Sequence, residues 1–137
     1  MIRFLLVSVT GWVAVLFTGV EVALPYIIRT KVVPDSRAGL PASVPRLRTG
    51  MWPHYWLGFA LVGLVLVHAS FVGPMMGRSD ATGTWAATLA LCLLFLQVGL
   101  GLNLKSGTGP IRQLRQWHFW SMIGLAASVL AHLFRNA

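Results

Sequence analysis

Apolar residues along the chain gather into four long runs, and the short stretches between them hold most of the charged residues. The runs cover residues 4–28, 51–76, 84–104 and 114–134. A helix needs about 20 apolar residues to cross the hydrocarbon core of a bilayer, and each run meets that length. None of them has the alternation of a half-buried strand. The pattern predicts an all-α protein: a bundle of four transmembrane helices forming one domain over residues 1–137.

Composition agrees with a lipid environment. Hydrophobic residues make up 56% of the chain and charged residues only 10%. A soluble domain of this size needs a polar exterior, and the chain has too few polar residues to supply one.

The first run begins almost at the N-terminus, where a cleaved signal peptide would lie. It is longer than the apolar core of such a peptide, and no small-x-small cleavage site follows it. We therefore expect a retained helix that leads, after Pro25, into a basic loop from Arg29 to Gly50. Three prolines in this loop disfavour a continuous helix there.

The basic residues fall unevenly between the two sides that four helices define. One side holds eight of them: Arg29, Lys31, Arg37, Arg46, Arg48, Lys105, Arg112 and Arg115. The other side holds three: Arg3, Arg78 and Arg135. By the positive-inside rule, loops 29–50 and 105–113 lie in the cytoplasm and both termini lie outside, across the inner membrane of a prokaryote. The net charge of +8 is then a signal for membrane orientation and lipid headgroups, and no nucleic acid partner is expected.

All four histidines of the chain lie in the second and fourth runs. His54 and His68 are fourteen residues apart, and so are His118 and His132. Fourteen helical residues rise about 21 Å and return to within about 40° of the same face. Each of these helices therefore presents two imidazoles on one face at two depths.

The second and fourth helices run in the same direction, because one crossing separates them. His54 then lies level with His118, and His68 lies level with His132. A short repeat with an offset of 64 residues aligns a His-aromatic-Trp sequence at the first pair and a Val-Leu sequence before the second. A repeated hairpin would place the two helices face to face across the bundle. Since imidazole is a common axial haem ligand, we expect an inner haem between His54 and His118 and an outer haem between His68 and His132.

Other uses of these histidines are open or disfavoured. A histidine in a membrane helix can simply bond a neighbouring helix, which would make the chain a structural membrane subunit without haem. Zinc and copper sites need three or four close ligands, and neither level offers an evident third or fourth ligand beside its two histidines. Covalent haem is excluded because the chain has no C-x-x-C-H motif and its single cysteine is Cys92.

Glu21 is the one acidic residue inside a run, at about the depth of the inner haem. Its carboxyl group has three possible roles: proton delivery to a quinone, a bond to the cofactor, or a bond to a neighbouring helix in the protonated form. Gln97 and Asn103 on the third helix are further polar candidates.

Four arginines near the cytoplasmic ends are candidate partners of the inner-haem propionates, in addition to their role in topology: Arg46, Arg48, Arg112 and Arg115. Five glycines would allow close approach of a porphyrin or of a neighbouring helix: Gly58, Gly63, Gly99, Gly101 and Gly124.

Paired histidines on the second and fourth helices of a four-helix bundle resemble the haem-binding half of cytochrome b in respiratory and photosynthetic bc-type complexes. The membrane domains of ferric reductases and NADPH oxidases are similar. The resemblance covers residues 4–134 and implies transmembrane electron transfer through two non-covalent b haems. It also implies a larger redox complex with partners such as a cytochrome c or an iron-sulfur protein, linked to the quinone pool.

Imidazole on both axial faces leaves the iron no vacant position, so electron relay is the expected role rather than catalysis at the metal. The alternative is an enzyme, a stand-alone quinone-linked or ferric-type reductase core.

Overall fold

Each apolar run forms one long helix. The computed structural model describes residues 2–32, 51–72, 80–107 and 109–136. Its helices are α1 (Ile2–Val32), α3 (Trp52–Val72), α4 (Ala81–Ser106) and α5 (Ile111–Asn136). All four are long and apolar enough to cross a membrane. The prediction of an all-α chain with four helices of membrane-spanning length is confirmed.

Helix α1 ends later than the apolar pattern predicts. It runs through Pro25 and past Ile28 to Val32. Proline has no N–H, so Pro25 cannot donate to the carbonyl of Glu21 one turn earlier. A helix continues past such a defect because, in lipid, other backbone groups have no partner except one another. The rest of the predicted basic loop, with Arg46 and Arg48, lies outside the described residues.

A left-handed glycine ends α4. Gly107 has φ 72° and its N–H donates to the carbonyl of Asn103 at 3.2 Å. A side chain other than hydrogen would be strained at this φ. The chain then reverses into α5, whose first turn follows Pro110.

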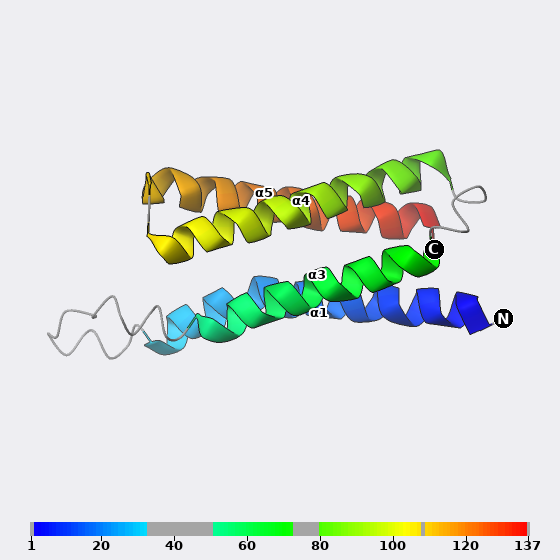
Figure 1. Cartoon of the computed structure of the whole chain (residues 1–137), viewed down its shortest axis with the longest axis horizontal. Helices are drawn as coiled ribbons and strands as arrows, with labels where there is room; N and C mark the ends of the chain where they lie inside the picture. Colours follow the sequence, from blue (N-terminus) through cyan, green and yellow to red (C-terminus); the bar gives the residue numbers. More distant parts are fainter. Residues whose placement is uncertain (1, 33–50, 73–79, 108, 137) are drawn as a thin grey trace, which may run out of the picture.

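The four helices form two antiparallel hairpins, α1 with α3 and α4 with α5 (Figure 1). Packing within each hairpin is much closer than packing between them, where α3 and α4 make most of the contacts. Both termini lie at the same end of the bundle, and α3 and α5 run in the same direction (Figure 1). The predicted parallel relation of the two histidine-bearing helices is thus observed.

The buried core is a thin layer at the middle of the bundle. It consists of Leu61, Leu94 and Leu125, from α3, α4 and α5, with Phe17 of α1 packed against it. Leu61 is seven residues from each histidine of α3, and Leu125 is seven residues from each histidine of α5. The leucine layer therefore separates two histidine levels.

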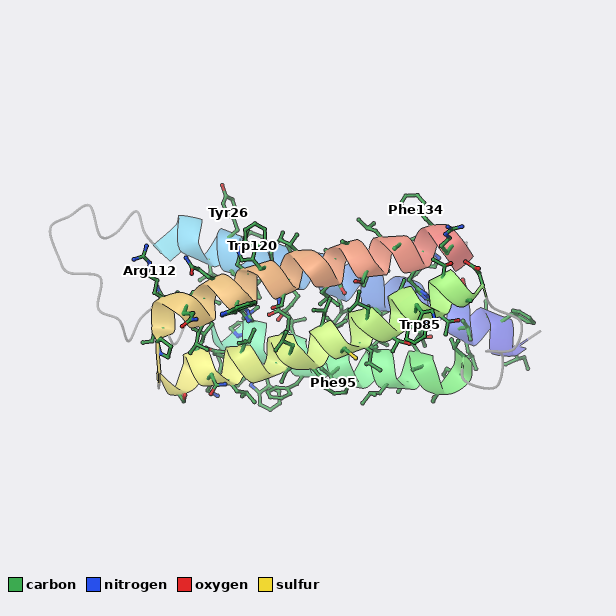
Figure 2. All side chains as sticks on the ribbon, turned by 90° about the horizontal axis from the view of Figure 1, so that it is seen from above. Tyr26, Trp85, Phe95, Arg112, Trp120 and Phe134 are labelled. Atoms are coloured by element: carbon green, nitrogen blue, oxygen red, sulfur yellow. The ribbon has the colours of Figure 1, made fainter. Side chains whose placement is uncertain are left out.

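The outer surface of the bundle is apolar. Large side chains such as Trp85, Trp120 and Phe134 are 74%, 65% and 84% exposed, and Figure 2 shows Phe134 projecting outward from the bundle. An exterior of this kind suits lipid and is unusual for a monomer in water.

Candidate functional site

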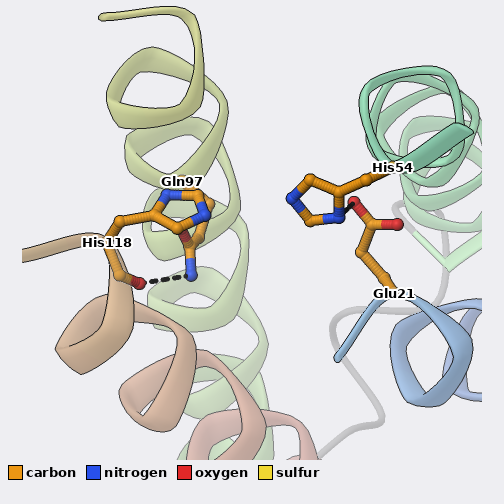
Figure 3. Close-up of polar contacts among 4 residues, drawn as sticks. All are labelled: Glu21, His54, Gln97 and His118. Carbon is orange, nitrogen blue, oxygen red and sulfur yellow. Dashed lines mark hydrogen bonds and ion pairs between the residues drawn. The ribbon is translucent and has the colours of Figure 1, made fainter. Parts of the chain in front are cut away.

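The level of His54 and His118, called the inner level below, joins the two hairpins through a pair of imidazoles. The rings of His54 on α3 and His118 on α5 have centroids 6.3 Å apart and planes at 82°. In Figure 3, the ring nitrogen of His54 that lies away from Glu21 points toward His118. The two side chains predicted to share this level therefore face each other.

Glu21 of α1 stands behind His54. Its Oε1 lies 2.9 Å from Nδ1 of His54, and the two side chains are only 17% and 15% exposed. The contact angle falls outside hydrogen-bond geometry, and Oε2 of Glu21 has no hydrogen-bond partner among the described residues. A carboxylate oxygen is an acceptor, so this contact favours a proton on Nδ1 of His54 and a lone pair on Nε2.

His118 is held differently, through its backbone. Gln97 of α4 donates from Nε2 to the carbonyl of His118 at 2.9 Å (Figure 3). Oε1 of Gln97 and Nδ1 of His118 are buried, and neither has a hydrogen-bond partner in the described part of the chain. Gln97 thus belongs to the inner level, as one of the predicted polar candidates. Asn103, the other, is exposed and caps the end of α4 with its carbonyl.

At the outer level, Nδ1 of His68 lies 3.0 Å from Oγ1 of Thr10 on α1. Nδ1 of His132 lies 3.0 Å from the carbonyl oxygen of Gly83 on α4. A carbonyl can only accept, so Nδ1 of His132 carries the proton. His68 and His132 each lie seven residues beyond the leucine layer on two parallel helices (Figure 1), so the second predicted pair also shares a level.

Nδ1 is therefore the hydrogen-bonded nitrogen of His68 and His132, and in His54 it is the nitrogen beside Glu21 without a hydrogen bond; each of the three partners is an acceptor or can act as one. A neutral imidazole with its proton on Nδ1 has its lone pair on Nε2. That tautomer is the one needed to bind a metal through Nε2, with the second nitrogen bonded to an outer group.

Sequence reasoning missed the partners Thr10 and Gly83. Thr10 belongs to a Thr-Gly dipeptide that occurs again at residues 18–19 of the same helix. The helix rise distinguishes the two: Thr10 lies about 16 Å from Glu21 along α1, toward the outer level, whereas Thr18 lies only about 4 Å from it. Depth was therefore a signal that could have selected Thr10, although the sequence does not show that Thr10 faces α3.

Of the arginines predicted near the inner level, Arg112 and Arg115 lie in the first turns of α5 and are exposed. Figure 2 shows Arg112 at the end of the bundle. The cation found between the hairpins is instead Lys105 of α4, whose Nζ lies 5.1 Å from the ring centroid of Tyr55 on α3. Tyr55 follows His54 directly, so Lys105 borders the inner level. Sequence analysis placed Lys105 only among the topology charges.

The five candidate glycines divide into two groups. A Cβ on Gly58 would lie 3.2 Å from Oε1 of Glu21, and one on Gly101 would lie 3.7 Å from Cε1 of His118. These two make room at the inner level. Gly124 packs against a leucine of α4, and Gly63 and Gly99 have nothing within 4 Å of the added atom.

Among the described residues, no group of three or more His, Cys, Asp and Glu side chains could hold a metal ion. Each level has two imidazoles, and two is the number of ligands that a protein can supply to an iron whose other four positions are filled by a porphyrin. The chain matches no protein-family model, no curated protein and no solved structure.

Proposed function

We propose that this protein is a dihaem b-type cytochrome that carries electrons across a membrane. His54 and His118 hold the inner haem, and His68 and His132 hold the outer haem. The chain acts as the membrane subunit of a larger redox complex. Its redox partners are the quinone pool and a protein such as a cytochrome c or an iron-sulfur subunit.

The observation that carries the proposal is the shared orientation of the histidines. Nδ1 of His54, His68 and His132 meets a carboxylate, a hydroxyl and a carbonyl, respectively. Histidines that only tie helices together can bond through either ring nitrogen. Ligands that bind a metal through Nε2 bond an outer partner through Nδ1–H, because Nε2 must keep its lone pair, and the contacts of these histidines agree with that arrangement.

The distance at the inner level fits the same proposal. Two imidazoles that bind one ion from opposite sides, each through a nitrogen at about 2 Å, have ring centroids about 6 Å apart. His54 and His118 have centroids 6.3 Å apart. Their backbones belong to hairpins that pack loosely against each other, which suits a planar group held between the rings.

Haem held by these histidines would supply one-electron chemistry, and two imidazoles for each iron would favour relay over catalysis. The protein's own residues orient the imidazoles and separate the two levels from each other. Thr10 and the Gly83 carbonyl bond the imidazoles of His68 and His132, Glu21 lies beside His54, and the layer of Leu61, Leu94 and Leu125 separates the two levels. Along the helices, the levels are about 21 Å apart.

For orientation we propose both termini outside and the loops 29–50 and 105–113 in the cytoplasm of a prokaryote, from the distribution of basic residues. Arg112 and Arg115 then lie at the cytoplasmic end, where they and the cationic Lys105 are suited to the propionates of the inner haem.

One observation favours the alternative, a quinone-linked reductase core. Oε2 of Glu21 and Oε1 of Gln97 are buried acceptors without partners among the described residues, and both lie at the inner level. Acceptors of this kind suit the hydroxyl donors of a quinol. Under this alternative, the chain alone would oxidise a quinol or reduce an acceptor.

The absorption spectrum of the purified chain in detergent tests the proposal. We expect b-type bands and two haems per chain by pyridine haemochrome titration. A chain without haem, produced with haem in excess, would overturn the proposal. Turnover of a quinol analogue by the chain without partners would favour the reductase alternative over the relay.

A further inference from the structure

Helix α1 carries none of the proposed ligands, but its Thr10 and Gly11 meet His68. We propose that this Thr10–Gly11 dipeptide is the positioning element of the outer site. Thr10 selects the tautomer of His68 that keeps a lone pair on Nε2, and Gly11 makes room for the ring. The inference rests on the proposed function, and it adds residues that contact neither the haem iron nor any other metal.

The hydrogen-bond partners of Thr10 fix the direction of its bond to His68. Oγ1 of Thr10 lies 2.7 Å from the carbonyl of Leu6 and 3.2 Å from that of Val7. A hydroxyl has one hydrogen, and both carbonyls are acceptors, so the hydrogen points at the helix backbone. Oγ1 then meets Nδ1 of His68, at 3.0 Å, with a lone pair. Therefore Nδ1 of His68 is the donor, and Nε2 is the nitrogen without a proton.

Gly11 controls where that ring can lie. A Cβ at Gly11 would stand 3.1 Å from Cε1 and 3.5 Å from Nδ1 of His68. The first distance is too short for ordinary packing, so the ring would move away from α1 by a few tenths of an ångström. Thr10 directly precedes Gly11 on the same helix, so this movement lengthens the hydrogen bond between Thr10 and Nδ1 of His68. Thr10 thus sets the tautomer of His68, and Gly11 sets the distance of the His68 ring from α1 and so the length of the bond to Thr10.

The same helix contains a matched control. Thr18 donates to the carbonyl of Ala14 at 2.8 Å, the same backbone bond that Thr10 makes to Leu6. Gly19 has nothing within 4 Å of an added Cβ. Substitutions at residues 18 and 19 therefore reproduce the local helix chemistry of residues 10 and 11 without touching a histidine.

The experiment compares Thr10→Val, Thr10→Ser and Gly11→Ala with Thr18→Val and Gly19→Ala. Each full-length chain is titrated with haem in detergent, and the His68→Ala variant identifies the spectrum and potential of the outer haem. Loss of an outer partner of a metal ligand lowers metal affinity about 10–100-fold. We expect that loss at the outer site in Thr10→Val, a smaller loss in Gly11→Ala, and wild-type binding in Thr10→Ser and both controls.

The reduction potential gives a readout that a packing defect alone does not predict. A bonded Nδ1–H makes imidazole a stronger donor to ferric iron, so losing the acceptor raises the potential. We expect the outer haem of Thr10→Val to have a higher midpoint potential and the inner haem to be unchanged. Equal affinities and potentials in Thr10→Val and Thr18→Val would overturn the inference.

Two results keep this inference distinct from the proposed function. A wild-type chain that binds no haem overturns the function, and the tautomer of His68 in the haem-free chain, read from ¹⁵N chemical shifts, still tests the role of Thr10. An Nε2–H tautomer in the wild type would refute that role. If Gly11→Ala fails to fold by circular dichroism, the comparison of Thr10→Val with Thr10→Ser decides.

Discussion

The pairing of histidines by level makes a prediction about double variants. Replacing His54 or His118 by Ala removes one imidazole of the inner pair, and replacing His68 or His132 removes one of the outer pair. If each pair shares one haem, the double variant His54→Ala/His118→Ala loses no more haem than either single variant. The double variant His54→Ala/His132→Ala loses both haems.

The expected size follows from the geometry. Centroids of His54 and His118 are 6.3 Å apart, while His54 and His132 belong to levels separated by about 21 Å along the helices. Two imidazoles on one ion need a separation of about 6 Å, so no exchange of partners between levels can rescue a lost ligand. Each single variant should therefore keep one haem per chain, half of the wild-type content.

The assay is haem per chain by pyridine haemochrome, with redox titration to tell the haems apart. His54→Ala and His118→Ala should lose the same redox component, and His68→Ala and His132→Ala the other. Loss of a common component in His54→Ala and His132→Ala would refute the parallel arrangement of α3 and α5. Circular dichroism of each variant controls for unfolding.

Three further predictions concern the inner level and the topology. Glu21→Gln keeps an acceptor for His54 but cannot carry a proton, so both haems should stay while quinone-linked reduction slows; loss of the inner haem would make Glu21 a structural partner only. Gly58→Ala should shift the inner-haem potential, because its Cβ would lie 3.2 Å from Oε1 of Glu21, whereas Gly63→Ala meets nothing within 4 Å and should match the wild type. In a chain with Cys92→Ser, the change Ser43→Cys should leave a thiol that resists a membrane-impermeant reagent added to intact cells, and labelling from outside would reverse the proposed topology.

The sequence was enough to predict the helices and the levels of the histidines. Helix number follows from run length alone, because each run is long enough to span a bilayer and is flanked by polar residues. Levels follow from the constant rise of a helix, which fixes the depth of His68 relative to His54 whatever surrounds them. The end of α1 was missed because the basic residues Arg29 and Lys31 mark the end of the apolar run and were assigned to the following loop, whereas the helix runs on to Val32.

The partners of the histidines could not be predicted in the same way. In a soluble helix, the polar face tells which side turns outward. Most residues of these helices are apolar and their few polar residues define no continuous polar face, so the sequence does not show how α1 is rotated against α3 or α4 against α5. That rotation decides whether Thr10 faces His68, and it brings the backbone carbonyl of Gly83, which no side chain marks, to His132.

The contacts also divide the work between the helices of each hairpin. In both hairpins, the second helix carries the histidines and the first positions them: α1 meets α3 through Thr10 and Glu21, and α4 meets α5 through Gly83 and Gln97. The repeat of 64 residues covers α3 and α5 but not their partners, since Glu21 and Gln97 differ in charge and in the atoms they contact. The histidines are therefore duplicated while their outer partners are not. The two levels differ in these partners: a hydroxyl and a backbone carbonyl at one level, the carboxyl group of Glu21 and the amide of Gln97 at the other. Because outer partners tune a metal ligand, the two proposed haem sites would have the same ligands and different properties.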